Sequence, residues 1–296
     1  LKLLFATFII LPLLPNETLD PWDSLNPYKL WWLVILISSL SLVGYIAVRW
    51  FGRDKGLLLT GFFGGLVSST AVTLSFSKRS KDDPKLGNAL TIGILVAWSI
   101  MFVRVIVEVA VVNPSMVMAL LFPMLGMGVA TALVVAWFWF QGEPEGNPKE
   151  PEKTEAEKTE AEKTEAEKKE GEEVDVKNPF ALTEAIKFGI LFAVVLLIVA
   201  LAQEYASAEW LYAVAALAGG TDVDVVALSM AESAGKDLDP QIAVRAIVIA
   251  SLSNTYVKAG LVVTLGSRAM AWKVGAATLA ITLGGALVLV LQAYLG

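Results

Sequence analysis

The chain has 296 residues, of which 56% are hydrophobic and 18% charged, with a formal net charge of −6 and neither cysteine nor histidine. Its charge is uneven, because residues 141–177 carry 7 lysines and 14 acidic residues and the remainder is close to neutral. Soluble domains hold about 45–50% apolar residues and more charge, so the composition indicates a multi-pass membrane protein.

The missing residue types exclude several kinds of chemistry. A chain without cysteine or histidine has no disulfide, thiolate metal site, imidazole relay or Ser-His-Asp triad. No glycine-rich phosphate motif and no basic, aromatic patch is present. We therefore expect no enzyme, no cofactor and no nucleic-acid partner, and any bound metal would be a hard cation held by oxygen ligands.

The hydrophobic pattern predicts an all-α integral membrane protein in the lipid bilayer of the cell membrane. A membrane-crossing helix needs about 20 mainly apolar residues. Eight stretches of this kind predict about eight transmembrane helices: residues 30–48, 56–77, 88–112, 115–140, 181–203, 208–231, 241–265 and 272–294. Most tryptophans lie near the ends of these stretches, as is usual at membrane interfaces, whereas Trp98 lies in the middle of one.

A shorter apolar segment precedes the first of these helices within residues 1–15. Its length suits the core of a signal peptide, but it has a single lysine and no small-residue cleavage site. We favour the end of a helix that belongs to a longer parent protein.

Residues 141–177 are predicted to form a charged low-complexity linker. The pentapeptide TEAEK repeats from Thr154, Thr159 and Thr164, and its opposite charges lie three and four residues apart. Such segments are partly helical, semi-rigid spacers. A solvated tether is the favoured interpretation, and binding through its acidic face is the alternative.

The segments on either side of the linker resemble each other. Residues 65–75 align without a gap on residues 219–229, and at the same offset of 154 Arg104 falls on Lys258. The pairs Asn-Pro and Asp-Pro also recur in the same order. We expect two four-helix repeats, residues 26–140 and 178–296, which arise by duplication.

Four helices return a chain to its starting side, so the two repeats are expected to be parallel, related by an axis along the membrane normal. The linker then begins and ends on one face. Its lysines favour the cytoplasmic side for that face.

Ionisable residues inside a membrane helix are costly and tend to face a partner or a water-filled cavity. In each repeat, the second predicted helix carries an oxygen-rich segment and the third carries a cation, at aligned positions. These residues predict a polar binding site near the membrane midplane: Ser68, Ser69, Thr70, Arg104, Glu108, Asp222, Asp224, Asn254 and Lys258. Glycines precede both oxygen-rich segments and permit either close helix packing or a helix break that exposes backbone groups to an ion.

Structural interpretations of the same residues stay open. Arg104 and Glu108 are four apart and neutralise one another on a continuous helix. Asp222 and Asp224 are two apart, about 200° around a helix, so both face one site only if the helix is broken there.

The segments LDPWDSLNPYKLWWLVILISSLSLVGYIAVR and GLLLTGFFGGLVSSTAVTLS carry a family resemblance. They resemble the C-terminal membrane domain of unknown function in MgtC/SapB-type bacterial and archaeal proteins, where this domain commonly follows an MgtC domain. The resemblance implies an upstream MgtC domain as a partner and a link to magnesium limitation. It implies no activity for this domain.

The leading hypothesis is a transporter of an ion, such as a divalent cation like magnesium, or of a small solute. The alternative is a regulatory or scaffold protein that packs against a membrane partner or a second copy of itself. In that case changes at Gly64 or Gly219 would matter more than changes at the carboxylates.

Overall fold

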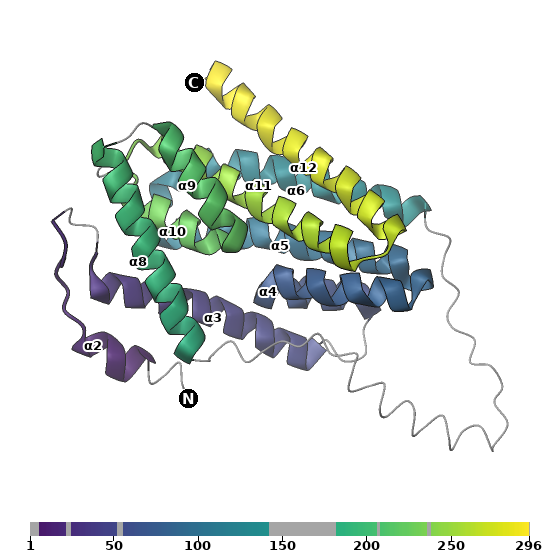
Figure 1. The fold of residues 1–296 in the computed structure, drawn as a ribbon, viewed down its shortest axis with the longest axis horizontal. Coiled ribbons are helices and arrows are strands. Elements are labelled where there is room, and N and C mark those ends of the chain that lie inside the picture. The colour runs from purple at the N-terminus through teal and green to yellow at the C-terminus, as the bar shows by residue number, and fades with distance from the viewer. Residues whose placement is uncertain are drawn as a thin grey trace.

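The protein is all-helical in a computed structural model that describes residues 6–21, 25–51, 56–141, 182–205, 208–235 and 238–295 (Figure 1). The predicted linker, residues 141–177, lies almost entirely outside these residues. The long helices are α3 (Pro27–Phe51), α4 (Gly56–Asp82), α5 (Gly87–Val112), α6 (Val117–Gln141), α8 (Leu182–Tyr205), α9 (Ala208–Thr221), α10 (Val223–Ser233), α11 (Pro240–Leu265) and α12 (Arg268–Leu295). Short turns are η1 (Ala6–Ile10), α2 (Leu11–Leu13), η2 (Pro84–Leu86) and η3 (Pro114–Met116).

Polar caps and prolines set the starts of several helices. The Asp239 carboxylate accepts a hydrogen bond from the Gln241 backbone N–H at 2.7 Å, and Pro240 is the first residue of α11. Asp83 caps η2 in the same way, through the Lys85 backbone N–H at 3.2 Å. The side chain thus satisfies a free N–H, and proline occupies a position that needs none.

Six of the described helical segments are long and apolar enough to cross a membrane, fewer than the eight predicted. The fifth predicted stretch forms α8, in which the apolar segment is the shorter Gly189–Leu201. The sixth divides into α9, with 14 residues, and α10, with 11. At 1.5 Å per residue each half is about 16–21 Å long, too short for a hydrocarbon core of about 30 Å.

The second stretch is also not one straight crossing, because α4 doubles back on itself at Ser68. Ser68 has the non-helical angles φ −164° and ψ 105°. Leu57, near the start of α4, and Phe76, near its end, both lie beside Gly93 of α5. A Cβ atom built on Gly93 would lie 3.1 Å from the Leu57 carbonyl oxygen and 2.5 Å from the Phe76 ring. In a straight helix Leu57 and Phe76 would be about 28 Å apart. The two parts of α4 therefore form a helical hairpin, both legs of which pack on α5.

The junction of α9 and α10 repeats this geometry. Asp222, the single residue between them, has φ −153° and ψ 116°, close to the angles at Ser68. α9 and α10 both pack against α8 and α11. In Figure 1, α10 returns beside α9 instead of continuing its axis. We call α4 the first hairpin and α9–α10 the second hairpin.

α6 and α12 pack closely and run in opposite directions. The Gln292 amide, near the end of α12, donates to the Ala119 carbonyl at the start of α6, at 2.9 Å. At the other end Lys273, in the first turns of α12, lies 5.6 Å from the ring centroid of Phe138. The helices cross where Gly126 approaches Gly284, and a Cβ built on either glycine would lie within 2.8 Å of the other's carbonyl oxygen.

The predicted parallel orientation of the two halves is therefore wrong, since α6 and α12 would then run in the same direction. The prediction counted each apolar stretch as one crossing. A stretch that doubles back returns the chain to the side from which it came, so the count of crossings in each half changes from even to odd.

Helix ends gather at two opposite faces. On the first, which we call the linker face, the Ser267 N–H donates to Ser80 Oγ at 2.9 Å and Lys273 donates to the Asn88 side chain at 2.9 Å. α6 also ends there, since the Asn88 amide donates to the Phe138 carbonyl. On the opposite face the Lys29 ammonium pairs with Glu232 at 3.2 Å.

The core lies along α5 and α11. Trp98, the tryptophan in the middle of a predicted span, is fully buried, and its indole N–H donates to Thr73 Oγ1 on the first hairpin at 3.0 Å. At the N-terminus, η1 and α2 pack on α3. This agrees with a helical segment within residues 1–15, but it does not test whether a longer helix continues upstream.

Candidate functional site

The two hairpin tips are capped by polar side chains. Ser68 Oγ accepts a hydrogen bond from the Ala71 N–H at 3.2 Å, and Asp222 Oδ1 accepts one from the Asp224 N–H at 2.9 Å. Each side chain therefore satisfies a free N–H at the start of the second leg. The helix is thus broken at Asp222, which caps α10, and Asp224 lies in the first turn of α10.

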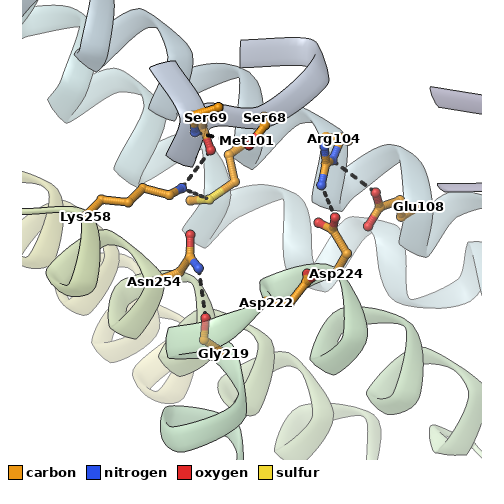
Figure 2. A network of polar contacts seen from close by, with 11 residues as sticks. Ser68, Ser69, Met101, Arg104, Glu108, Gly219, Asp222, Asp224, Asn254 and Lys258 are labelled. Carbon is orange, nitrogen blue, oxygen red and sulfur yellow. Dashed lines mark hydrogen bonds and ion pairs between the residues drawn. The ribbon is translucent and has the colours of Figure 1, made fainter. Parts of the chain in front are cut away.

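Arg104 of α5 reaches the tip of the second hairpin (Figure 2). Its Nη2 donates to Asp224 Oδ2, and its Nε lies 3.2 Å from Glu108 Oε1. The Glu108 side chain is fully buried, and that of Asp224 is 3% exposed. The contact between Arg104 and Glu108 agrees with the structural interpretation, and the contact with Asp224 joins two segments that lie 120 residues apart.

Lys258 of α11 reaches the tip of the first hairpin. Its ammonium donates to Ser69 Oγ at 2.7 Å and lies 2.9 Å from the Met101 sulfur of α5. Only 1% of Lys258 is exposed. It therefore does not extend to a membrane surface, in line with the expectation that it has a partner inside the protein.

Hydrogen bonds to backbone carbonyls fix the last turn of α9. The Asn254 amide donates to the Gly219 carbonyl at 2.9 Å, and Ser253 Oγ donates to the Ala216 carbonyl at 2.5 Å. The last carbonyls of a helix have no partner within the helix. Asn254 is therefore a helix-end partner in this structure, and its role as an ion ligand stays a prediction.

The predicted site residues divide into two groups and two separate residues. Arg104, Glu108 and Asp224 form one group, with Asp222 capping α10, and Lys258 and Ser69 form the other, with Ser68 capping the second leg of the first hairpin. Thr70 is exposed one residue beyond Ser69, and Asn254 binds the α9 backbone. Whether these groups bind a transported ion stays a prediction.

Sequence reasoning missed two contacts. Met101 is a thioether neighbour of Lys258, and no sequence signal marks such a residue among the many apolar side chains of α5. Asn113 donates to the Ala231 and Ala234 carbonyls, each at 3.1 Å, and so fixes the end of α10 against α5. An asparagine directly before Pro114 was the available signal, because it marks a helix end.

No metal centre is found among the residues that the structure describes, since they hold no group of three or more acidic side chains placed to bind one. Instead the buried acids share the guanidinium of Arg104.

Comparison with known proteins assigns the family. Residues 35–266 match a domain family of unknown function, DUF4010. The chain belongs to the DUF4010 family. A relative from Aquifex aeolicus (strain VF5), named "Uncharacterized protein", is 28% identical over 213 residues, which cover 72% of this chain and 83% of the relative.

No solved structure matches this DUF4010 chain. The resemblance to a domain of unknown function is thus confirmed, while neither match carries the MgtC/SapB name, and that link stays a prediction.

Proposed function

We propose that this DUF4010 protein is a transporter of an ion or small solute, and not an enzyme, with its site where the two hairpin tips approach α5 and α11. The observation that carries the proposal is the pair of helix breaks at Ser68 and Asp222. Non-helical backbone at membrane depth is tolerated only where it is buried in protein or lines a cavity. In secondary transporters, broken helices of this kind form substrate and ion sites.

The second support is a pseudo-twofold arrangement of the two halves. The breaks at Ser68 and Asp222 are separated by the offset of 154 residues that aligns Arg104 with Lys258. The contacts between the halves follow the same symmetry, because Arg104 of the first half binds the second hairpin and Lys258 of the second half binds the first hairpin. Each half then has three crossing helices and one hairpin.

Three crossings per half make the two repeats inverted, related by an axis in the membrane plane. The antiparallel packing of α6 and α12 fits this arrangement. Inverted repeats allow alternating access, because exchanging the conformations of the two halves moves the opening from one side of the membrane to the other.

The inverted arrangement also gives an orientation. Lys29 and Arg245 belong to the opposite face, whereas the linker face carries a larger set of basic residues: Lys78, Arg79, Lys81, Lys85, Arg268 and Lys273. Basic residues favour the cytoplasmic side. The excess of basic residues on the linker face therefore favours a cytoplasmic linker.

Cysteine labelling tests this topology, and the chain contributes no cysteine of its own. Lys85→Cys in η2, directly before α5, and Gln241→Cys at the start of α11 replace exposed side chains. In intact cells a membrane-impermeant maleimide is expected to label Gln241→Cys and to leave Lys85→Cys unlabelled until the cells are opened. Labelling of both positions from the same side would contradict inverted repeats.

Flux measurements test the transport proposal itself. Purified protein in liposomes is expected to move at least one of sodium, potassium, magnesium, chloride or phosphate down an imposed gradient. Asp224→Asn and Lys258→Met are each expected to reduce this flux to near background, because each removes a charge buried at a hairpin tip.

The matched control is Glu232→Gln, which removes an acid of the second hairpin at the membrane surface and should keep most of the flux. Absence of flux for every ion in folded wild-type protein would count against transport of an ion.

The scaffold alternative has less support in the structure. Gly64 and Gly219 are buried, and Cβ atoms built on them would lie 2.7 Å from a Val72 methyl group and 2.5 Å from the Ala250 Cα atom, respectively. These glycines therefore serve packing inside the protein rather than packing against a partner in the membrane.

A further inference from the structure

Glu108 is a buried acid whose carboxylate has no hydrogen bond. It lies in α5 and is fully buried, and neither of its oxygens has a hydrogen-bond partner among the described residues. The nearby Arg104 Nε, 3.2 Å from Oε1, is not aligned to donate to it. A carboxylate that is removed from water and not hydrogen-bonded is strongly disfavoured relative to its neutral acid.

The charges around Glu108 do not balance. Arg104 is shared by Glu108 and Asp224, and Asp224 Oδ1 also has no hydrogen-bond partner within the described structure. Asp222 adds a third acid at the start of α10. Lys258 also acts electrostatically on Asp222, so two cations face three acids, and the binding of one proton balances the charges.

Of the two acids that share Arg104, Glu108 gains more from a proton. Asp224 accepts directly from Arg104 and lies in the first turn of α10, where the helix dipole favours negative charge. Glu108 lies within α5, where the backbone N–H groups are used by the helix. The carboxylate of Asp224 is thus stabilised twice, and that of Glu108 only by the nearby guanidinium.

The fold itself does not require an acid at this position. The residue aligned with Glu108 at the offset of 154 is Val262, which is fully buried in α11. An apolar side chain thus fills the equivalent place in the other half. An acid kept in a buried position that an apolar residue can fill is typical of a functional group.

The other ionisable groups of the helices around Glu108 lie at the first hairpin tip or towards one of the two faces. Lys258 of α11 points to the first hairpin tip, and Glu232 ends α10 at the opposite face. α6 has no charged residue. The charged residues of α4 and α12 lie in the parts of those helices nearest the linker face: Lys78, Arg79, Lys81, Asp82, Arg268 and Lys273.

We propose that Glu108 is a proton-binding site, in which a proton adds to a carboxylate oxygen while Arg104 stays paired with Asp224. Release of the proton restores the Glu108 carboxylate, which then competes with Asp224 for the guanidinium. The protonation state of Glu108 thereby changes how firmly Arg104 holds the second hairpin tip. That this proton is coupled to transport rests on the proposed function, whereas proton binding does not.

Infrared difference spectroscopy of the purified full chain in lipid tests the site directly. A pH step is expected to produce the carbonyl stretch of a buried protonated carboxyl group in the wild type. Glu108→Gln should remove this band, and the control Glu232→Gln should keep it. The amide of Glu108→Gln imitates the neutral acid, so this variant is expected to fold as well as the wild type.

Three outcomes would overturn the proposal. The first is a wild-type protein without a titrating buried carboxyl band, which needs no variant to observe. The second is a band that survives Glu108→Gln and disappears in Asp224→Asn. The third is a band that follows added sodium chloride at fixed pH, which would indicate a sodium site.

Proton uptake into liposomes separates this proposal from the transport proposal. A pH-sensitive dye inside the vesicles should report proton movement that Glu108→Gln abolishes and Glu232→Gln retains. A Glu108 band without any flux would support the proton site and contradict transport. Ion flux without a Glu108 band would do the reverse.

Discussion

Arg104→Met is expected to lower the free energy of unfolding by about 3–5 kcal/mol, the usual cost of removing one partner from a buried ion pair. The substitution preserves much of the side-chain volume but leaves Asp224 and Glu108 without their shared cation. Denaturant titration in detergent micelles, followed by tryptophan fluorescence, measures the loss. Adding Asp224→Asn to Arg104→Met should recover part of it, because one of the two uncompensated carboxylates disappears.

Lys29→Met is the matched control for this substitution. It breaks the ion pair with Glu232, in which Lys29 is 52% exposed, and exposed pairs contribute about 0–1 kcal/mol. Equal losses in Arg104→Met and Lys29→Met, or no recovery in the double variant, would show that the Arg104 contacts do not stabilise the hairpin tip.

Gly65→Ala is expected to destabilise the protein by about 1–3 kcal/mol, although alanine is normally the better helix former. A Cβ on Gly65 would lie 2.7 Å from the Ala97 Cα atom, so the first hairpin would have to move away from α5. A shift of the hairpin displaces its tip, and we expect the flux in liposomes to fall with the stability. Thermal unfolding and flux measured on the same preparation check both effects.

Gly128→Ala provides the comparison within α6. A Cβ there would meet no atom within 4 Å, so the substitution should be neutral or slightly stabilising. A Gly65→Ala protein as stable as Gly128→Ala would contradict the close packing of the first hairpin on α5.

The positions of the helices could be predicted from the sequence, but their paths could not. Length and hydropathy identify where helices such as α5 and α11 lie, and the Asp-Pro pairs mark where they start. The return of α4 at Ser68 has only an ambiguous signal, the preceding glycines, which suit close packing equally well, and its two legs are as apolar as one straight helix. A single missed reversal in each half was sufficient to make the predicted relative orientation wrong.

The residues of the candidate site could be predicted only in part. Charged residues in apolar helices are conspicuous, so Arg104, Asp224 and Lys258 could be selected from the sequence alone. Their pairing could not, because it depends on which hairpin tip faces which helix. Met101 was missed because a thioether in an apolar helix resembles any other packing residue.

The attachment of the second hairpin gives it a mechanical property. Its first leg, α9, is fastened to α11 of its own half by Asn254, whereas its second leg, α10, is fastened to α5 of the other half by Arg104 and Asn113. Asp222 alone joins the legs. Because α10 also packs on α8 and α11 of its own half, it joins the two halves, and Asp222 is the residue at which its angle to α9 can change when one half moves past the other.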